Sequence, residues 1–111
     1  MVLYNKVLNK LILSNLSIST AESCTGGLLA YSFVKYANSS KIFKGGYITY
    51  SNQLKVADLN VKKITLNKFG AVSKETVKEM VIGLYLKSKT DISIATTGIA
   101  GPTGATKNKP I

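Results

Sequence analysis

Residues 17–30 read S-I-S-T-A-E-S-C-T-G-G-L-L-A, and this stretch decides the fold class. Its first part alternates polar and apolar residues, which predicts a short strand over residues 17–21. The two glycines, Gly26 and Gly27, then open an apolar run that predicts a helix over about residues 26–36. A strand that passes through a short loop into a helix is the beginning of an α/β unit.

The rest of the chain continues this alternation of strands and helices. Apolar residues at helical spacing predict a first helix, with one face formed by Tyr4, Val7, Leu8, Leu11 and Ile12. G-Y-I-T-Y over residues 46–50 and D-I-S-I-A-T over residues 91–96 are typical of strands, and N-S-S over residues 38–40 is typical of a turn. One layered α/β domain, with helices packed on a central sheet, is therefore predicted.

Two further helices are predicted from their caps. Ser51 or Asn52 caps a helix that runs to about residue 59, and Ser73 caps the longest helical pattern of the chain. The buried stripe predicted for this last helix consists of Val77, Met80, Val81 and Leu84.

The composition narrows the possible chemistry. The chain has 111 residues, 15 basic against 5 acidic, and a net charge of +10, and every basic residue is a lysine. Because there is no histidine, a Ser-His-Asp triad, a Cys-His pair and histidine metal ligation are excluded. Five scattered carboxylates also argue against a metal site. Any base working near neutral pH must be a lysine, a tyrosine or a carboxylate.

Charge and cysteine content also predict partners and location. The lysines are scattered and arginine is missing, which favours a solvated coat that attracts anions over a nucleic-acid surface. A single cysteine fits a reducing compartment, and no apolar run is long enough for a membrane span. We therefore expect a cytoplasmic protein with neither a membrane nor a nucleic-acid partner.

Polar and glycine-rich segments follow all three predicted strands. They are S-C-T-G-G at residues 23–27, Ser51 with Asn52, and T-G-I-A-G at residues 97–101. If the strands are parallel, these segments meet at one edge of the sheet, where α/β proteins bind ligands. Backbone N–H groups at a helix N-terminus there would favour a phosphate or an oxyanion. From the spacing alone, Ser23 is equally consistent with a helix cap and with a catalytic or anion-binding residue.

Four ordered blocks carry a more specific signal. T-A-E-S-C-T-G-G (20–27), G-G-Y-I-T-Y-S-N-Q-L-K (45–55), F-G-A-V-S (69–73) and T-G-I-A-G-P-T-G (97–104) together resemble the C-terminal domain of the CinA family, also known as a stand-alone nicotinamide-nucleotide amidase. The resemblance implies a three-layer α/β/α sandwich around a mixed or mostly parallel sheet, formed by residues 1–111 as one domain. It also implies hydrolysis of nicotinamide mononucleotide to nicotinate mononucleotide and ammonia, with no organic cofactor.

The same resemblance implies roles for individual residues. Ser23 corresponds to the nucleophile and Lys55 to its base, and in a chain without histidine a neutral lysine is a chemically reasonable partner for a serine. Tyr50 and Thr97 match hydroxyls that line the site. The residues implied to contact substrate are Glu22, which orients a ribose hydroxyl or a neighbouring loop, Thr25, Gly26 and Gly27 at the phosphate or oxyanion, and Ser51, Asn52 and Gly98. Cys24 reads as a small buried residue.

The end of the sequence departs from the family pattern. Members continue beyond the glycine-rich loop with further strands and a final helix, whereas this sequence ends at Ile111. We therefore expect a sheet that is incomplete at its C-terminal end, which favours a homo-oligomer. The alternatives to an active amidase are an inactive CinA-like remnant and a basic nucleic-acid-binding accessory protein.

Overall fold

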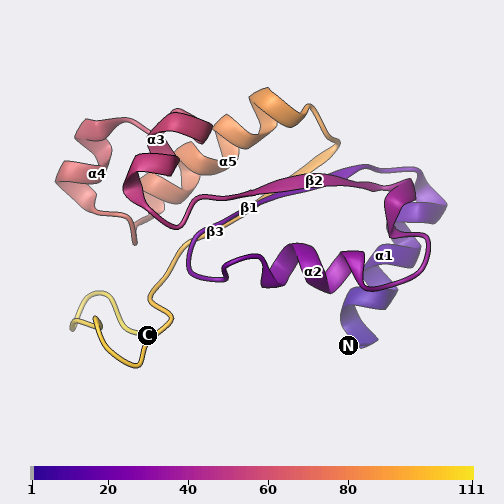
Figure 1. Ribbon diagram of the computed structural model, residues 1–111, viewed down its shortest axis with the longest axis horizontal. Coiled ribbons are helices and arrows are strands. Elements are labelled where there is room, and N and C mark those ends of the chain that lie inside the picture. Colours follow the sequence, from indigo (N-terminus) through magenta and orange to yellow (C-terminus); the bar gives the residue numbers. More distant parts are fainter. Residues whose placement is uncertain (1) are drawn as a thin grey trace.

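A three-stranded parallel sheet lies at the centre of the computed structural model, which describes residues 2–111 (Figure 1). The strands are β1 (Ile18–Glu22), β2 (Phe43–Ile48) and β3 (Ile92–Thr96), in the order β2-β1-β3. Both neighbours run parallel to β1, with Glu22 opposite Ile48 on one side and Thr96 on the other. The carboxyl ends of all three strands therefore meet at one edge of the sheet.

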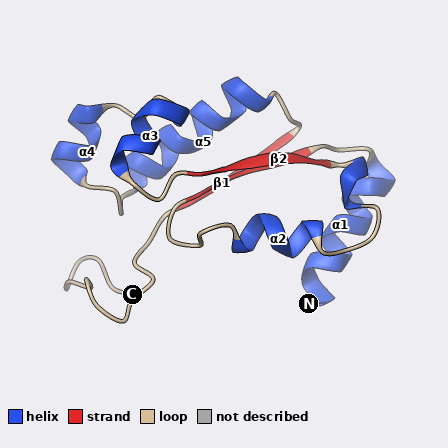
Figure 2. Cartoon of the chain, viewed as in Figure 1, coloured by secondary structure: helices blue, strands red, loops and turns tan. Residues whose placement is uncertain are grey.

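Helices cover both faces of this sheet. They are α1 (Val2–Ser14), α2 (Leu28–Val34), α3 (Asn52–Leu59), α4 (Lys63–Phe69) and α5 (Lys74–Ser88), with a 3-10 turn, η1 (Ser39–Lys41). Figure 2 shows α3, α4 and α5 on one side of the strands and α1 and α2 on the other. This arrangement is the predicted three-layer α/β/α sandwich, and the described sheet is wholly parallel.

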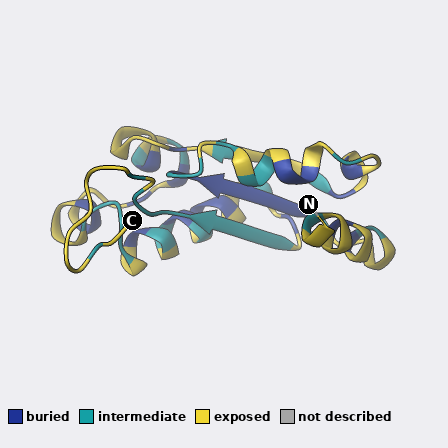
Figure 3. Cartoon of the chain, turned by 90° about the horizontal axis from the view of Figure 1, so that it is seen from below, coloured by how far each residue is buried: buried dark blue, intermediate teal, exposed yellow. Residues whose placement is uncertain are grey.

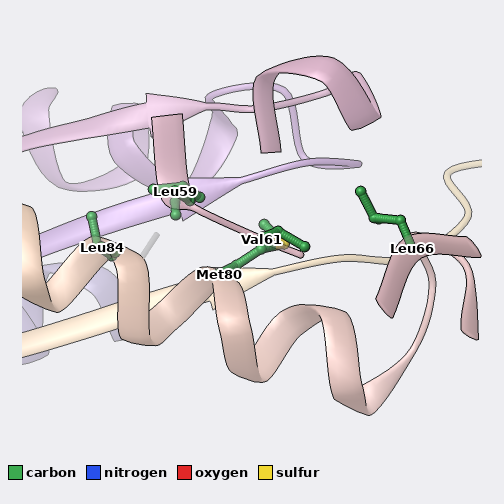
Figure 4. Close-up of a cluster of buried hydrophobic side chains, with 6 residues drawn as sticks. Leu59, Val61, Leu66, Met80 and Leu84 are labelled. Atoms are coloured by element: carbon green, nitrogen blue, oxygen red, sulfur yellow. The ribbon is translucent and has the colours of Figure 1, made fainter. Parts of the chain in front are cut away.

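Each face of the sheet has its own apolar core. The cluster beneath α3, α4 and α5 consists of Ala21, Leu59, Val61, Leu66, Met80 and Leu84 (Figure 4). The cluster on the other face consists of Leu8, Leu11, Ile18, Phe33 and Ile42. Ile18 and Ala21 of β1 belong to different clusters because side chains along a strand alternate between its faces. The central strand thus contributes to both cores.

The two outer strands are less protected than the central one. All five residues of β1 are buried, whereas all five of β3 are only half-buried. Figure 3 shows this contrast between the dark blue β1 and the teal β3. Among the described residues, β3 has no strand on its outer side.

The helix after β1 begins later than predicted. We expected it from Gly26, but α2 begins at Leu28. Gly26 and Gly27 have φ values of 58° and 108°, in the left-handed region, so neither continues a right-handed helix. The strand boundaries also differ by one to three residues, and β2 lies over Phe43–Ile48 instead of residues 46–50.

Two features of the helical layer were not predicted. The connection before Ser73 contains a helix, α4, whose N-cap residue Lys62 gives no side-chain cap. The fully buried positions of α5 are Thr76, Met80, Gly83 and Leu84, while Val77 and Val81 are half-buried. Gly83 is buried because α3 crosses there: a Cβ at this position would lie 1.9 Å from the carbonyl oxygen of Leu59.

Candidate active site

The parallel sheet brings Ser23 and Lys55 together. Ser23 directly follows β1, and Lys55 lies in α3, which begins shortly after β2 ends. The Nζ atom of Lys55 donates a hydrogen bond of 2.9 Å to the Oγ atom of Ser23. Since β1 and β2 end at the same edge, residues that are 32 positions apart in the sequence become direct partners.

Lys55 is buried in spite of its charge. Its side chain is 0% exposed, and Nζ also donates to the backbone carbonyls of Thr49, at 2.7 Å, and Tyr50, at 3.0 Å. Removal from water lowers the pKa of Lys55 below the ordinary value of 10.5, partly offset by a coulombic interaction with Cys24, which raises the pKa. The amine is thus biased toward its neutral, basic form.

The three acceptors around Nζ define what the pair can do. A neutral amine has two N–H bonds, which the carbonyls of Thr49 and Tyr50 can accept, and one lone pair, which is then left for Ser23. In that state the Ser23 hydroxyl donates to Nζ and the amine is placed to take its proton. The arrangement has the geometry of a Ser–Lys pair for nucleophilic attack.

Ser23 opens onto a cavity of about 350 Å³, called here the Ser23 cavity. The hydroxyl lies at its floor, since Ser23 is only 6% exposed. Its walls come from the loop after β1, the end of β2, the α4–α5 connection and the loop after β3: Ser23, Cys24, Tyr50, Ala71, Val72, Gly98, Ile99, Ala100, Gly101 and Thr103. A small ligand in this cavity would lie directly against the Ser23 hydroxyl.

The loop that carries Ser23 is tied to the end of β3. The N–H of Ser23 donates to the carbonyl of Thr96 at 3.2 Å, and the hydroxyls of Thr25 and Thr96 are 2.8 Å apart. Within the loop, the Gly26 N–H donates to the Ser23 carbonyl at 3.1 Å. The alternative that Ser23 caps a helix is wrong, because the N-cap of α2 is Gly27 and the Ser23 hydroxyl binds Lys55.

Glu22 faces α2 instead of the Ser23 cavity. Its carboxylate accepts hydrogen bonds from the backbone N–H groups of Gly27, Leu29 and Ala30, at 3.2, 2.8 and 3.0 Å. The side chain is 1% exposed and does not line the cavity. Of the two roles predicted for Glu22, these contacts agree with orienting a neighbouring segment, and both carboxylate oxygens accept from backbone N–H groups.

Two backbone donors of the loop stay available. Within residues 2–111, the N–H groups of Cys24 and Thr25 have no hydrogen-bond partner, whereas those of Gly26 and Gly27 are already engaged. Of the three residues predicted to serve a phosphate or an oxyanion, only Thr25 keeps a free N–H. Cys24, adjacent to Ser23, offers the second free N–H.

The predicted hydroxyl residues have different positions. Tyr50 lines the Ser23 cavity, with its side chain 71% exposed, and its backbone carbonyl holds Lys55. The Thr97 hydroxyl donates to the carbonyl of Ala71 at 2.8 Å. It thereby ties the end of β3 to the α4–α5 connection, so its contact in this structure is with the cavity wall.

Of the remaining residues predicted to contact substrate, Gly98 lies at the Ser23 cavity, whereas Ser51 and Asn52 lie at the beginning of α3. Gly98 lines the Ser23 cavity, where an added Cβ would lie 3.3 Å from the Cys24 sulfur. The Ser51 hydroxyl instead caps α3 by accepting from the Leu54 N–H at 3.1 Å. Asn52 lines a separate groove of about 460 Å³ between α3 and α4.

Sequence reasoning missed part of the cavity wall. Cys24, Ala71, Val72 and the residues that follow Gly98 line the cavity but were not predicted as site residues. The F-G-A-V-S block was the one signal that pointed to Ala71 and Val72.

Within residues 2–111, no group of three or more acidic, cysteine or histidine side chains is arranged to hold a metal ion. In the same part of the chain, every helix is too short or too polar to cross a bilayer.

Comparison with known proteins gives the class of domain that this fold and site define. Residues 2–111 match the model of the CinA C-terminal domain, so the chain belongs to that family. It is 52% identical to a putative competence-damage inducible protein of Clostridium novyi, over 99% of this chain and 27% of the relative. It is 56% identical to a CinA-like protein of Kosmotoga olearia, over 95% of this chain and 26% of the relative.

Solved structures agree with the fold. The competence/damage inducible protein CihA from Agrobacterium tumefaciens superposes with a TM-score of 0.94 at 40% identity, over 98% of this chain and 66% of that one. A CinA superfamily protein from Escherichia coli superposes with a TM-score of 0.90 at 35% identity, over 97% of this chain and 63% of that one. The chain thus spans about a quarter of its curated relatives and just under two thirds of these solved chains.

Proposed function

We propose that this domain is an amidohydrolase that uses Ser23 and Lys55 to hydrolyse the carboxamide of nicotinamide mononucleotide. The observation that carries the proposal is the 2.9 Å contact between Ser23 Oγ and a fully buried Lys55 Nζ. A buried lysine is costly unless it is neutral or well paired, so its place beside a serine at a cavity floor favours catalysis. The four sequence blocks that resemble nicotinamide-nucleotide amidases support the substrate class.

The proposed first half-reaction forms an acyl-enzyme. Ser23 Oγ attacks the carboxamide carbon while its proton moves to Lys55 Nζ, giving a tetrahedral intermediate with a negative oxygen. The N–H groups of Cys24 and Thr25, the two residues that follow Ser23, are free to donate to that oxygen. When the C–N bond breaks, the Lys55 ammonium returns the proton to the leaving nitrogen, which departs as ammonia.

The second half-reaction regenerates the enzyme. Water attacks the acyl carbon, Lys55 takes one of its protons, and this proton returns to Ser23 Oγ as the acyl–oxygen bond breaks. The products are nicotinate mononucleotide and ammonia, and no redox step occurs. Thr49 and Tyr50 keep Nζ in place throughout, since their carbonyls accept from the amine and from the ammonium alike.

The test is ammonia release from nicotinamide mononucleotide by the purified chain, with nicotinate mononucleotide identified by chromatography. Ser23→Ala and Lys55→Met are expected to be inactive. Ser32→Ala is the matched control, because Ser32 is similarly buried but donates to the Leu28 carbonyl within α2, away from the cavity. A wild-type chain without activity under conditions where it is folded would favour the inactive-remnant alternative.

A further inference from the structure

We infer that Glu22 is the positioning residue of the Ser–Lys pair, because its side chain fixes the segment that follows Ser23 while its backbone fixes the segment that holds Lys55. Glu22 lies between the two halves of the site, as the last residue of β1 and the neighbour of Ser23. The inference rests on the proposed function for its catalytic consequence and on observed contacts for its structural part.

The side chain acts on the nucleophile's loop. Three backbone N–H groups at the beginning of α2 donate to the buried carboxylate, which also complements the positive end of the helix. The segment from Ser23 to Gly27 is thereby closed into a loop, because Glu22, which precedes Ser23, binds the N–H of Gly27 at the other end. Gly27 permits this closure with a φ of 108°, and a Cβ there would lie 3.1 Å from the Ile48 side chain.

The backbone acts on the base. The Glu22 carbonyl accepts from the Thr49 N–H at 2.8 Å, and the Thr49 carbonyl in turn accepts from Lys55 Nζ at 2.7 Å. Thr49 is 0% exposed and directly follows β2. Glu22 therefore positions both atoms of the pair. It positions Lys55 Nζ through these two hydrogen bonds, and it positions Ser23 Oγ through the peptide bond between Glu22 and Ser23.

Glu22 also restricts where a substrate anion can bind. The N–H groups of Gly27, Leu29 and Ala30 are occupied, and a carboxylate at the beginning of α2 repels a phosphate. The N-terminus of α2 is thus filled by an internal anion. A substrate phosphate must bind elsewhere, which separates anion recognition from the placement of Ser23.

The experiment compares Glu22→Ala and Glu22→Gln with the wild-type chain. Both remove the charge, and glutamine keeps nearly the same volume but presents N–H donors to backbone donors. We expect kcat for nicotinamide mononucleotide to fall on the order of 100-fold in Glu22→Ala, as misplacing a catalytic group does, with KM nearly unchanged. Labelling of Ser23 by a fluorophosphonate should slow in parallel.

Formate provides the specific readout. It can occupy the space left by the Glu22 side chain, so added formate should raise both the labelling rate and the melting temperature of Glu22→Ala, but not of wild type. Chloride at equal ionic strength is the salt control, and Glu75→Ala, on the exposed first turn of α5, is the matched glutamate control.

Several outcomes would overturn the inference. A Glu22→Ala protein with wild-type kcat would do so, and so would a raised KM at unchanged kcat, which indicates a substrate ligand. If Glu22→Ala does not fold, a Glu22→Gln protein with wild-type kcat and a wild-type labelling rate would also overturn the inference. If even the wild type neither turns over nor labels, the proposed function fails, whereas formate-dependent stabilisation of Glu22→Ala still supports the structural role.

Discussion

Among residues 2–111, the hydroxyl of Ser23 has one hydrogen-bond partner, the amine of Lys55. Ser23→Ala should therefore abolish fluorophosphonate labelling and ammonia release while changing the free energy of unfolding by only about 1 kcal/mol, the usual value of one hydrogen bond. The two carbonyls at Thr49 and Tyr50 still satisfy a neutral Lys55 amine. Labelling at a different residue, found by peptide mass analysis, would contradict the assignment of the nucleophile.

Lys55 predicts a distinctive response to charge-conserving substitution. Lys55→Arg keeps the positive charge but cannot supply a neutral base, since arginine stays protonated at accessible pH. We expect turnover near that of Ser23→Ala, whereas Lys41→Arg, at an exposed position, should behave as wild type. Near-normal turnover in Lys55→Arg would reduce Lys55 to a structural charge.

The lowered pKa of Lys55 also predicts how rate and stability change with pH. Activity should rise as pH passes upward through the folded-state pKa, which lies below 10.5, because the proposed mechanism requires the neutral amine. Over the window from that pKa up to 10.5 the unfolded chain binds more protons than the folded one, so stability also rises with pH. The stability of wild type relative to Lys55→Met should increase across this window in urea titrations, and a constant difference would contradict a shifted pKa.

At the scale of single elements, Gly83 fixes how closely α5 packs on α3. Its missing side chain lets the Leu59 carbonyl approach to 1.9 Å from where a Cβ would be. Gly83→Ala must therefore push two helices apart, although alanine is the better helix former. We expect destabilisation of several kcal/mol, at the upper end for single substitutions, in chemical denaturation. Lys78→Ala, on the exposed side of α5, is the control and should change stability little.

The short helix α4 depends on a side chain from α5. Glu79 accepts from the Lys62 N–H at 2.8 Å and from the Thr65 hydroxyl at 2.6 Å. Partial burial raises the pKa of Glu79, but these bonds and the Lys62 charge outweigh it and lower the pKa below the ordinary 4.5. Glu79→Ala should cost about 1–3 kcal/mol.

This cost should depend on pH. Because the folded-state pKa of Glu79 is lowered, its contribution is complete above pH 4.5 and is lost as pH falls through the folded value. Thermal unfolding of wild type and Glu79→Ala should therefore converge in acid. Glu75→Ala, on the same helix, should show a smaller loss, and an equal one would mean that the contact with α4 contributes nothing.

The sequence predicted helices and strands better than it predicted the contacts between residues far apart in the chain. Alternation and β-branched or aromatic residues located the three strands, helical spacing located α1, and caps located α3 and α5, because these signals are local. The helix α4 was missed because its N-terminus is held by Glu79, a contact across 17 residues that leaves no local signature. The start of α2 was misplaced because the left-handed backbone of Gly26 and Gly27 is set by Glu22 and the sheet.

The candidate site shows the same division. Without the family resemblance, Lys55 in a lysine-rich chain reads as a solvated surface residue, and only the fold shows that it is fully buried. Ser23 was noticed from its neighbours, but its helix-cap alternative was excluded only by its contact with Lys55. Glu22 was expected to meet substrate or a loop, and its hydrogen bonds to α2 depend on backbone groups that carry no sequence information.

For the molecule as a whole, the net charge and the distribution of the lysines lead to different expectations about nucleic-acid binding. The net charge of +10 attracts polyanions, but the lysines are spread over the whole sequence. We expect weak binding to duplex DNA that has no sequence preference and falls steeply with added salt, measurable by fluorescence anisotropy. Tight binding that resists 200 mM salt would favour the nucleic-acid alternative.

The burial of Lys55 distinguishes the amine of the candidate site from the accessible lysines that supply most of the positive charge. Amine-selective acetylation neutralises each lysine that the reagent can reach. Every other lysine of the described chain is at least partly accessible, whereas Lys55 is 0% exposed. Exhaustive acetylation of the folded protein would thus neutralise the accessible lysines and leave the amine of Lys55, the proposed base, unmodified. Any anionic substrate captured by long-range attraction would then bind more slowly, with the bond-breaking step unaltered.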